Sequence, residues 1–174
     1  YIAPLPAWLS VISYWLTGSP AFLILLQIVA GTLTAVGTAA IAGRLLNGGL
    51  PALAAGLAVA LHPGLTVYSA SRAHSLAFDA LCFTFALLQT FRIAERPTPA
   101  RAACLGLIVG VGTLSRATIL LFLPVAAAWL LISAGLTVGT AFRRVVLAAL
   151  CVAAVLAPWT ARNTLVHRSF VLLL

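Results

Sequence analysis

Few residues of this sequence could do chemistry, and most of them are arginines. The ten basic residues are all arginine, and the acids are Asp79 and Glu95. Arginine presents a planar fork of donors that fits two oxygens of a phosphate, whereas a carboxylate can take a proton as a general base. The composition therefore indicates contacts with anionic groups and offers at most two carboxylates for catalysis.

Three positions along the chain are candidates for binding a phosphate or a lipid donor. Arg116 lies between two apolar runs, Arg162 and Asn163 follow a Pro-Trp pair, and Arg72 comes two residues before His74. Each arginine also has a simpler interpretation, in which its side chain reaches lipid headgroups at the membrane boundary. Both interpretations stay open from the residues alone.

The histidines do not form a metal-binding pattern. His62, His74 and His167 are separated by 12 and 93 residues, and these spacings match no compact set of ligands. We therefore expect no metal site. His62 and His74, together with Tyr68 between them, are instead candidates for contacts with an acceptor or donor substrate.

Asp79 is a weak candidate for a catalytic acid or base. A carboxylate within a membrane segment is costly and usually has a partner. Arg72 or Arg116 would provide one, so a catalytic role and a buried salt bridge both remain open for Asp79.

The rest of the chain indicates what positions these residues. Of the 174 residues, 63% are hydrophobic and 7% are charged, which is too little charge to cover the surface of a soluble domain. The segments are apolar on all faces, whereas the strands of a membrane β-barrel alternate. The net charge of +8 is not gathered into a basic run, so we expect no nucleic-acid partner.

We predict an all-α, polytopic transmembrane helix bundle, forming a single domain over residues 1–174. Residues 1–17 are rich in Trp and Tyr and are too short to span after Pro4 and Pro6, which predicts an interfacial helix at the outer face. The six predicted spans cover residues 20–44, 51–67, 75–91, 102–115, 117–134 and 145–159. The last run ends at Pro158, and polar turns are expected at residues 68–74 and 160–170.

Residues 102–134 fit either one long helix or a hairpin that turns at Ser115 and Arg116. One long helix would leave Arg116 at mid-membrane, at a cost of about 2.5–3.5 kcal/mol on insertion scales. A hairpin groups the arginines of residues 44, 92–101 and 143–144 on the inner side, as the positive-inside rule favours. We choose the hairpin, which places Arg72, Arg116, Arg162 and all three histidines at the outer face.

The order of these segments resembles the GT-C membrane glycosyltransferases of family 39, which include dolichyl-phosphate-mannose protein mannosyltransferases and bacterial aminoarabinose transferases. The resemblance covers nearly the whole chain, and each motif alone is only modestly specific. It rests on the stretches APLPAWLSVISYWLTGSPAFLILLQIVAGTLT, ALHPGLTVYSASRAHSLAF, GVGTLSRATILLFLPVAAAWLL and APWTARNTLVHRSFVLL. The third is similar to the family's L-T-R-P hairpin, and the fourth to its P-W-x-x-R-N-x-x-V motif.

The resemblance implies transfer of a sugar from a polyprenyl-phosphate donor to a lipid, glycan or protein acceptor. Arg116 and Arg162 match family arginines and would hold the donor phosphate. No other cofactor is implied. The chain departs from the family at His74-Ser75, where Thr/Ser-Glu is usual, and at Ala117, where proline is usual.

The family's catalytic Asp lies in an outer loop before the proline-led helix, so the resemblance implies that it precedes Tyr1. We expect a piece of a longer protein, cut at both ends, with Val171 to Leu174 opening another apolar run. The expected location is the lipid bilayer, in a bacterial inner membrane with the active face outside. A transporter or flippase fragment without enzymatic activity is the alternative, and an inactive family member is a third.

Overall fold

Every element that the structure describes is a helix. The computed structural model describes residues 4–72, 74–132 and 135–168. The helices in chain order are α1 (Pro4–Thr17), α2 (Ala21–Leu45), α3 (Gly49–Ala60), α4 (Pro63–Ser71), α5 (Leu76–Glu95), α6 (Pro99–Ser115), the 3₁₀ helix η1 (Ala117–Leu121), α7 (Phe122–Ile132) and α8 (Val138–His167). The predicted all-α class is confirmed.

The six apolar segments occur in the predicted order but differ in length. Three helices, α2, α5 and α8, are each long and apolar enough to cross a membrane. The pair α3 and α4 would make a fourth span, bent by 42°. The remaining two segments, α6 and η1 with α7, are apolar but shorter. An integral membrane helix bundle follows.

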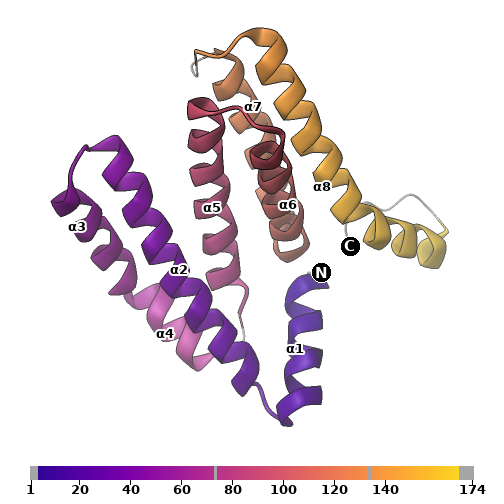
Figure 1. Ribbon diagram of the computed structural model, residues 1–174. Helices are drawn as coiled ribbons and strands as arrows, with labels where there is room; N and C mark the ends of the chain where they lie inside the picture. Colours follow the sequence, from indigo (N-terminus) through magenta and orange to yellow (C-terminus); the bar gives the residue numbers. More distant parts are fainter. Residues whose placement is uncertain (1–3, 73, 133–134, 169–174) are drawn as a thin grey trace. The chain divides into compact units, whose positions relative to one another are not determined.

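The chain divides into two compact units, and the boundary falls inside α5. The first unit is Pro4–Leu88. In it α2 runs beside α3 and α4 (Figure 1). Small residues allow this approach: an added Cβ at Gly56 would lie 3.1 Å from the Cβ of Ala39, and one at Gly37 would lie 2.9 Å from a methyl of Thr84. Close helix contact through small residues is typical of membrane bundles.

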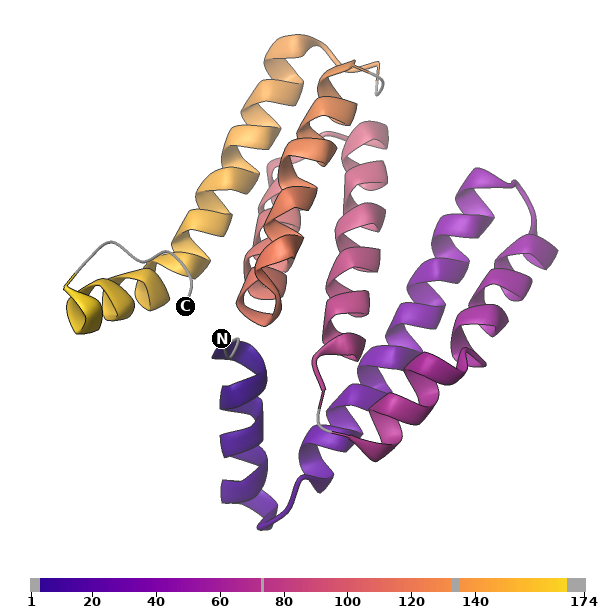
Figure 2. The same ribbon diagram turned by 180° about the vertical axis from the view of Figure 1, so that it is seen from behind.

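The second unit contains most of Gln89–Leu174. Its main contact is between α6 and α8. An added Cβ at Gly106 would overlap the carbonyl oxygen of Ala148, and one at Gly110 would lie 2.8 Å from Val155. From Gly106 to Gly110 the contacts move toward the C-terminus of both helices, so α6 and α8 run parallel. The chain therefore reverses direction between them, as Figures 1 and 2 show for α6, α7 and α8, and the predicted hairpin at Arg116 is present.

Three predicted boundaries were wrong. Pro158 does not end the last span, because α8 continues through it to His167, and the end of α8 runs at an angle to the rest in both views (Figure 2). Proline removes one helical hydrogen bond and bends a membrane helix without stopping it. Tyr68 to Ser71 belong to α4 rather than to a turn.

The third wrong boundary is at the start of the chain, where the helix was expected to follow Pro6, but α1 begins at Pro4 and includes Pro6. Proline is tolerated there because the N–H groups of the first turn have no helical acceptor. The apolar run predicted from Val171 lies outside the described residues.

Candidate functional site

Tyr68, Arg72 and His74 form one exposed group at the end of α4. The guanidinium carbon of Arg72 lies 6.0 Å from the centre of the Tyr68 ring. The ring of His74 meets the same tyrosine edge-on, with centroids 6.3 Å apart. Arginine, phenol and imidazole together can donate several hydrogen bonds to one anion. The sequence named all three residues, and the structure brings them together.

Gln27 of α2 fixes the turn that carries this group. Its side chain is fully buried. Its Nε2 donates to the carbonyl oxygens of Ser69 at 3.1 Å and Arg72 at 2.9 Å, and its Oε1 accepts from the backbone N–H of His74 at 2.8 Å. Buried polar groups are stable only when bonded in this way. The backbone on both sides of residue 73 is therefore held against α2.

The ring of His74 is fixed by a further bond. Its Nδ1 accepts from the backbone N–H of Leu76 at 3.1 Å, so Nδ1 carries no proton and the proton of a neutral ring lies on Nε2. His62 does the same at the start of α4, where its Nδ1 accepts from Leu65 at 3.4 Å. His62 precedes Arg72 by ten residues, about 15 Å along a helix, and so lies away from the group.

Asp79 lies in the first turn of α5 and is buried. The hydroxyl of Ser75 donates to its Oδ2 at 3.0 Å, and its own backbone N–H donates to the carbonyl of Ser75. The start of a helix favours negative charge. These contacts give Asp79 a role in stabilising the N-terminus of α5.

In the second unit, Arg116 directly follows the last residue of α6 and is exposed. Gly110 of α6 is level with Val155 of α8. Because the helices are parallel, Arg116 at the end of α6 lies toward the same end of the pair as the bent last part of α8, which contains Arg162 and Asn163. Positions 46 residues apart in the sequence are thus brought to one end of the α6–α8 pair.

Around Arg162, two buried donors lack acceptors among the described residues. The guanidinium of Arg162 lies 4.9 Å from the centre of the Trp159 ring, and its Nη1 donates to Oδ1 of Asn163 at 3.2 Å. Asn163 is 1% exposed, yet its Nδ2 has no partner there, and neither does Nε1 of Trp159. Unpaired buried donors are rare and costly, so they mark this end of α8 as a place for a hydrogen-bond acceptor.

Chemically, each group is suited to binding an anion rather than to breaking bonds. The group at the end of α4 and the group around Arg116 and Arg162 each combine arginine with neutral hydrogen-bond donors. Each group also lies at an end of a helix. The described residues contain no group of three or more His, Cys, Asp or Glu side chains that could hold a metal ion.

A model of the dolichyl-phosphate-mannose-protein mannosyltransferase family matches residues 2–161. The chain belongs to this family. The predicted kinship with the family 39 type of GT-C glycosyltransferase is confirmed. No curated protein and no solved structure matches significantly. The residues of this mannosyltransferase-family chain that match include the whole Gln27 turn and, in the second unit, Arg116 and Trp159.

Sequence reasoning missed Gln27 and the donor of Trp159. Gln27 is the one glutamine of its apolar span, and an uncharged polar residue in a membrane helix is a usable signal. The donor of Trp159 could not be found from the sequence, because the sequence does not show that its N–H is buried.

Proposed function

We propose that this chain is part of a membrane glycosyltransferase that transfers a sugar from a polyprenyl-phosphate donor to a lipid, glycan or protein acceptor. In the reaction, the bond between the sugar's anomeric carbon and the phosphate oxygen breaks, and an acceptor oxygen forms the new bond. Polyprenyl phosphate leaves with the charge, and the acceptor's proton goes to a base. The enzyme acts at the outer face of a bacterial inner membrane.

The end of the α6–α8 pair carries this proposal. Arg116 and Arg162 are exposed there, and Asn163 and Trp159 hold buried donors that have no acceptor among the residues the structure describes. A phosphate oxygen accepts several hydrogen bonds and is stabilised by arginine as its charge grows. We assign the donor phosphate to Arg116, Arg162 and Asn163. Arg72, with Tyr68 and His74, forms a second phosphate-binding group.

We expect the general base that takes the acceptor's proton to lie outside the two phosphate-binding groups. Asp79 is engaged with Ser75 at the start of α5, which leaves it poorly placed to receive an acceptor's proton. The family resemblance implies an aspartate in the outer loop that precedes the proline-led helix.

The direct test is transfer by the full-length protein in proteoliposomes. Supplied with a polyprenyl-phosphate sugar and an outer-face acceptor fraction, it should release polyprenyl phosphate in proportion to glycosylated acceptor. Transport is the competing function, favoured by the 42° bend between α3 and α4, because transporters bind substrate at broken helices. Movement of the lipid-linked sugar across the bilayer without its consumption would contradict the proposal and support transport.

A further inference from the structure

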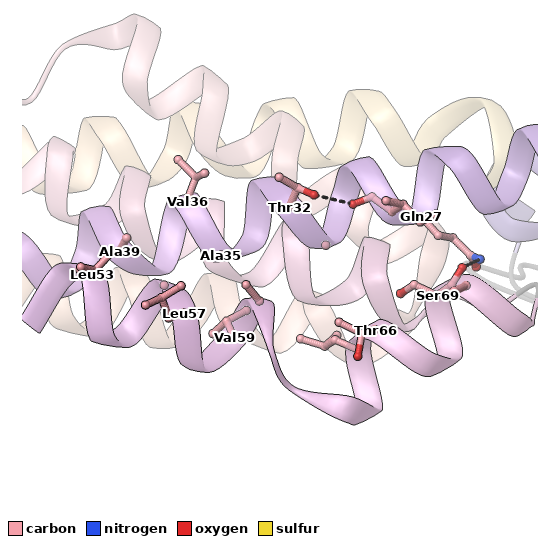
Figure 3. A pocket seen from close by; sticks show the side chains of 16 residues that line it. Gln27, Thr32, Ala35, Val36, Ala39, Leu53, Leu57, Val59, Thr66 and Ser69 are labelled. Carbon is pink, nitrogen blue, oxygen red and sulfur yellow. Dashed lines mark hydrogen bonds between the residues drawn. The ribbon is translucent and has the colours of Figure 1, made fainter.

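An apolar groove of about 530 Å³ lies in the first unit between α2 and the bent pair of α3 and α4. Figure 3 shows its length, from Gln27 and Ser69 at one end to Ala39 and Leu53 at the other. Its volume falls within the range of about 300–1,000 Å³ that is usual for ligand pockets. Neither the sugar transfer nor the two anion-binding groups account for it.

The helices that bound the groove touch near each of its ends. At one end Gly56 packs against Ala39. At the other, Gln27 bonds the carbonyl of Ser69. Between these contacts the wall of α2 includes Gly31, where an added Cβ would meet nothing within 4 Å.

The polar atoms along the groove are already bonded within the protein. The hydroxyl of Thr32 donates to the carbonyl of Ile28 at 3.0 Å, and that of Thr66 to the carbonyl of His62 at 3.0 Å. Both polar atoms of the Gln27 side chain are engaged with the turn. Apart from the hydroxyl of Ser69, the remaining side chains of the lining are apolar, so the matching occupant is a hydrocarbon chain.

The length and the ends of the groove indicate which hydrocarbon. Gln27 and Ala39 are twelve residues apart on α2, which is about 18 Å along the helix. One leaflet of the hydrocarbon core is about 15 Å deep, so the length of the groove matches a lipid chain of one leaflet. Arg72 and His74 adjoin the Gln27 end through the bonded turn, where a negative headgroup would lie.

We propose that the groove binds an acyl chain of an anionic bilayer phospholipid, whose phosphate is held by Arg72 and His74. This site does not depend on sugar transfer. It assigns the second phosphate-binding group to a resident lipid, separate from the donor phosphate at Arg116 and Arg162.

The test uses the full-length protein in bilayer discs that contain phosphatidylglycerol with a photoactivatable group in its acyl chain. After illumination and proteolysis, mass spectrometry should find label concentrated on residues 28–39 and 53–66. Label spread evenly over the other exposed apolar helices, or absent from the groove because another segment covers it, would overturn the proposal.

A matched pair of variants tests the groove itself. Gly31→Leu adds a side chain in the groove at a position where an added Cβ meets nothing within 4 Å, and Gly139→Leu adds the same side chain on α8, where an added Cβ also meets nothing within that distance. Displacing a few methylenes should lower labelling by about tenfold in Gly31→Leu and leave it unchanged in Gly139→Leu. Equal labelling of both variants would refute the groove. Thermal unfolding of both proteins checks that they fold.

The headgroup is tested with a phosphatidylcholine that carries the same photoactivatable chain. The anionic probe should label the groove several-fold more than the zwitterionic one, and Arg72→Gln should remove this difference. Equal labelling of the wild type by both probes would show the headgroup assignment to be wrong. Competition by stoichiometric polyprenyl phosphate would assign the groove to the donor and overturn the proposal.

Discussion

Gln27 shows how one polar side chain in an apolar helix can organise residues that are 42 to 47 positions further along the chain. Its three hydrogen bonds go to backbone atoms. They therefore fix the backbone positions of Arg72 and His74 without engaging the side chains of these two residues. Leaving a buried donor or acceptor unsatisfied costs more than a typical hydrogen bond contributes.

Replacing Gln27 by leucine should therefore destabilise the full-length protein by about 2–4 kcal/mol, since three bonds to buried or half-buried groups are lost. Gln89→Leu is the matched control. Gln89 is also buried, but among the described residues its Oε1 has no partner and its Nε2 donates to the sulfur of Cys104. Thermal unfolding in detergent should show a large fall for Gln27→Leu and a small change for Gln89→Leu. Equal falls would show that the turn does not depend on Gln27.

Asn163 is expected to matter for activity and not for stability. Its Nδ2 is buried without an acceptor in the described part of the chain, which costs about 1–3 kcal/mol. Asn163→Leu is therefore expected to keep or raise the unfolding temperature while lowering the rate of sugar transfer at least tenfold. A variant that loses stability and keeps its transfer rate would show Asn163 to be a structural residue.

At the scale of elements, the α6–α8 contact sets the register on which the donor site depends. Gly106 permits this contact, because an added Cβ would overlap the carbonyl oxygen of Ala148. Backbone cannot retreat as a flexible side chain can.

Gly106→Ala should accordingly destabilise the protein by about 1–3 kcal/mol. Gly139→Ala in α8 is the control, because nothing lies within 4 Å of the added atom and alanine favours a helix. Chemical or thermal unfolding of the two variants in detergent gives the comparison. A destabilised Gly139→Ala, or an unaffected Gly106→Ala, would contradict the parallel packing described for this pair.

The presence of a helix was predictable from the sequence wherever the composition of the segment alone determines it. Apolar length predicted the helices, and the cost of an arginine at mid-membrane predicted the hairpin at Arg116. The path of α8 was not predictable, because the sequence does not say whether Pro158 ends a helix or bends it. The groove between α2 and the α3–α4 pair was missed for a similar reason, because the sequence does not show the space that the bend of this pair leaves.

At the scale of the whole molecule, the sequence predicted the family, and the match to residues 2–161 confirms it. Order and spacing of motifs carried that prediction, since no single motif was specific. The roles of the candidate residues stay predictions, and their grouping in space was not readable from the sequence. Only packing shows that Tyr68, Arg72 and His74 form one group while His62 lies apart. Only packing shows, too, that the parallel helices α6 and α8 bring Arg116 and Arg162 to the same end of the pair.

The central claim is that Arg116 and Arg162 hold the donor phosphate, and the rate of sugar transfer in proteoliposomes tests it most directly. Each arginine is replaced by alanine in the full-length protein, with Arg143→Ala, an exposed arginine at the other end of α8, as control. Losing a group that stabilises the leaving phosphate should lower kcat/KM by about 10²–10³-fold, and Arg143→Ala should match the wild type. Unchanged transfer by folded Arg116→Ala and Arg162→Ala proteins would contradict the claim.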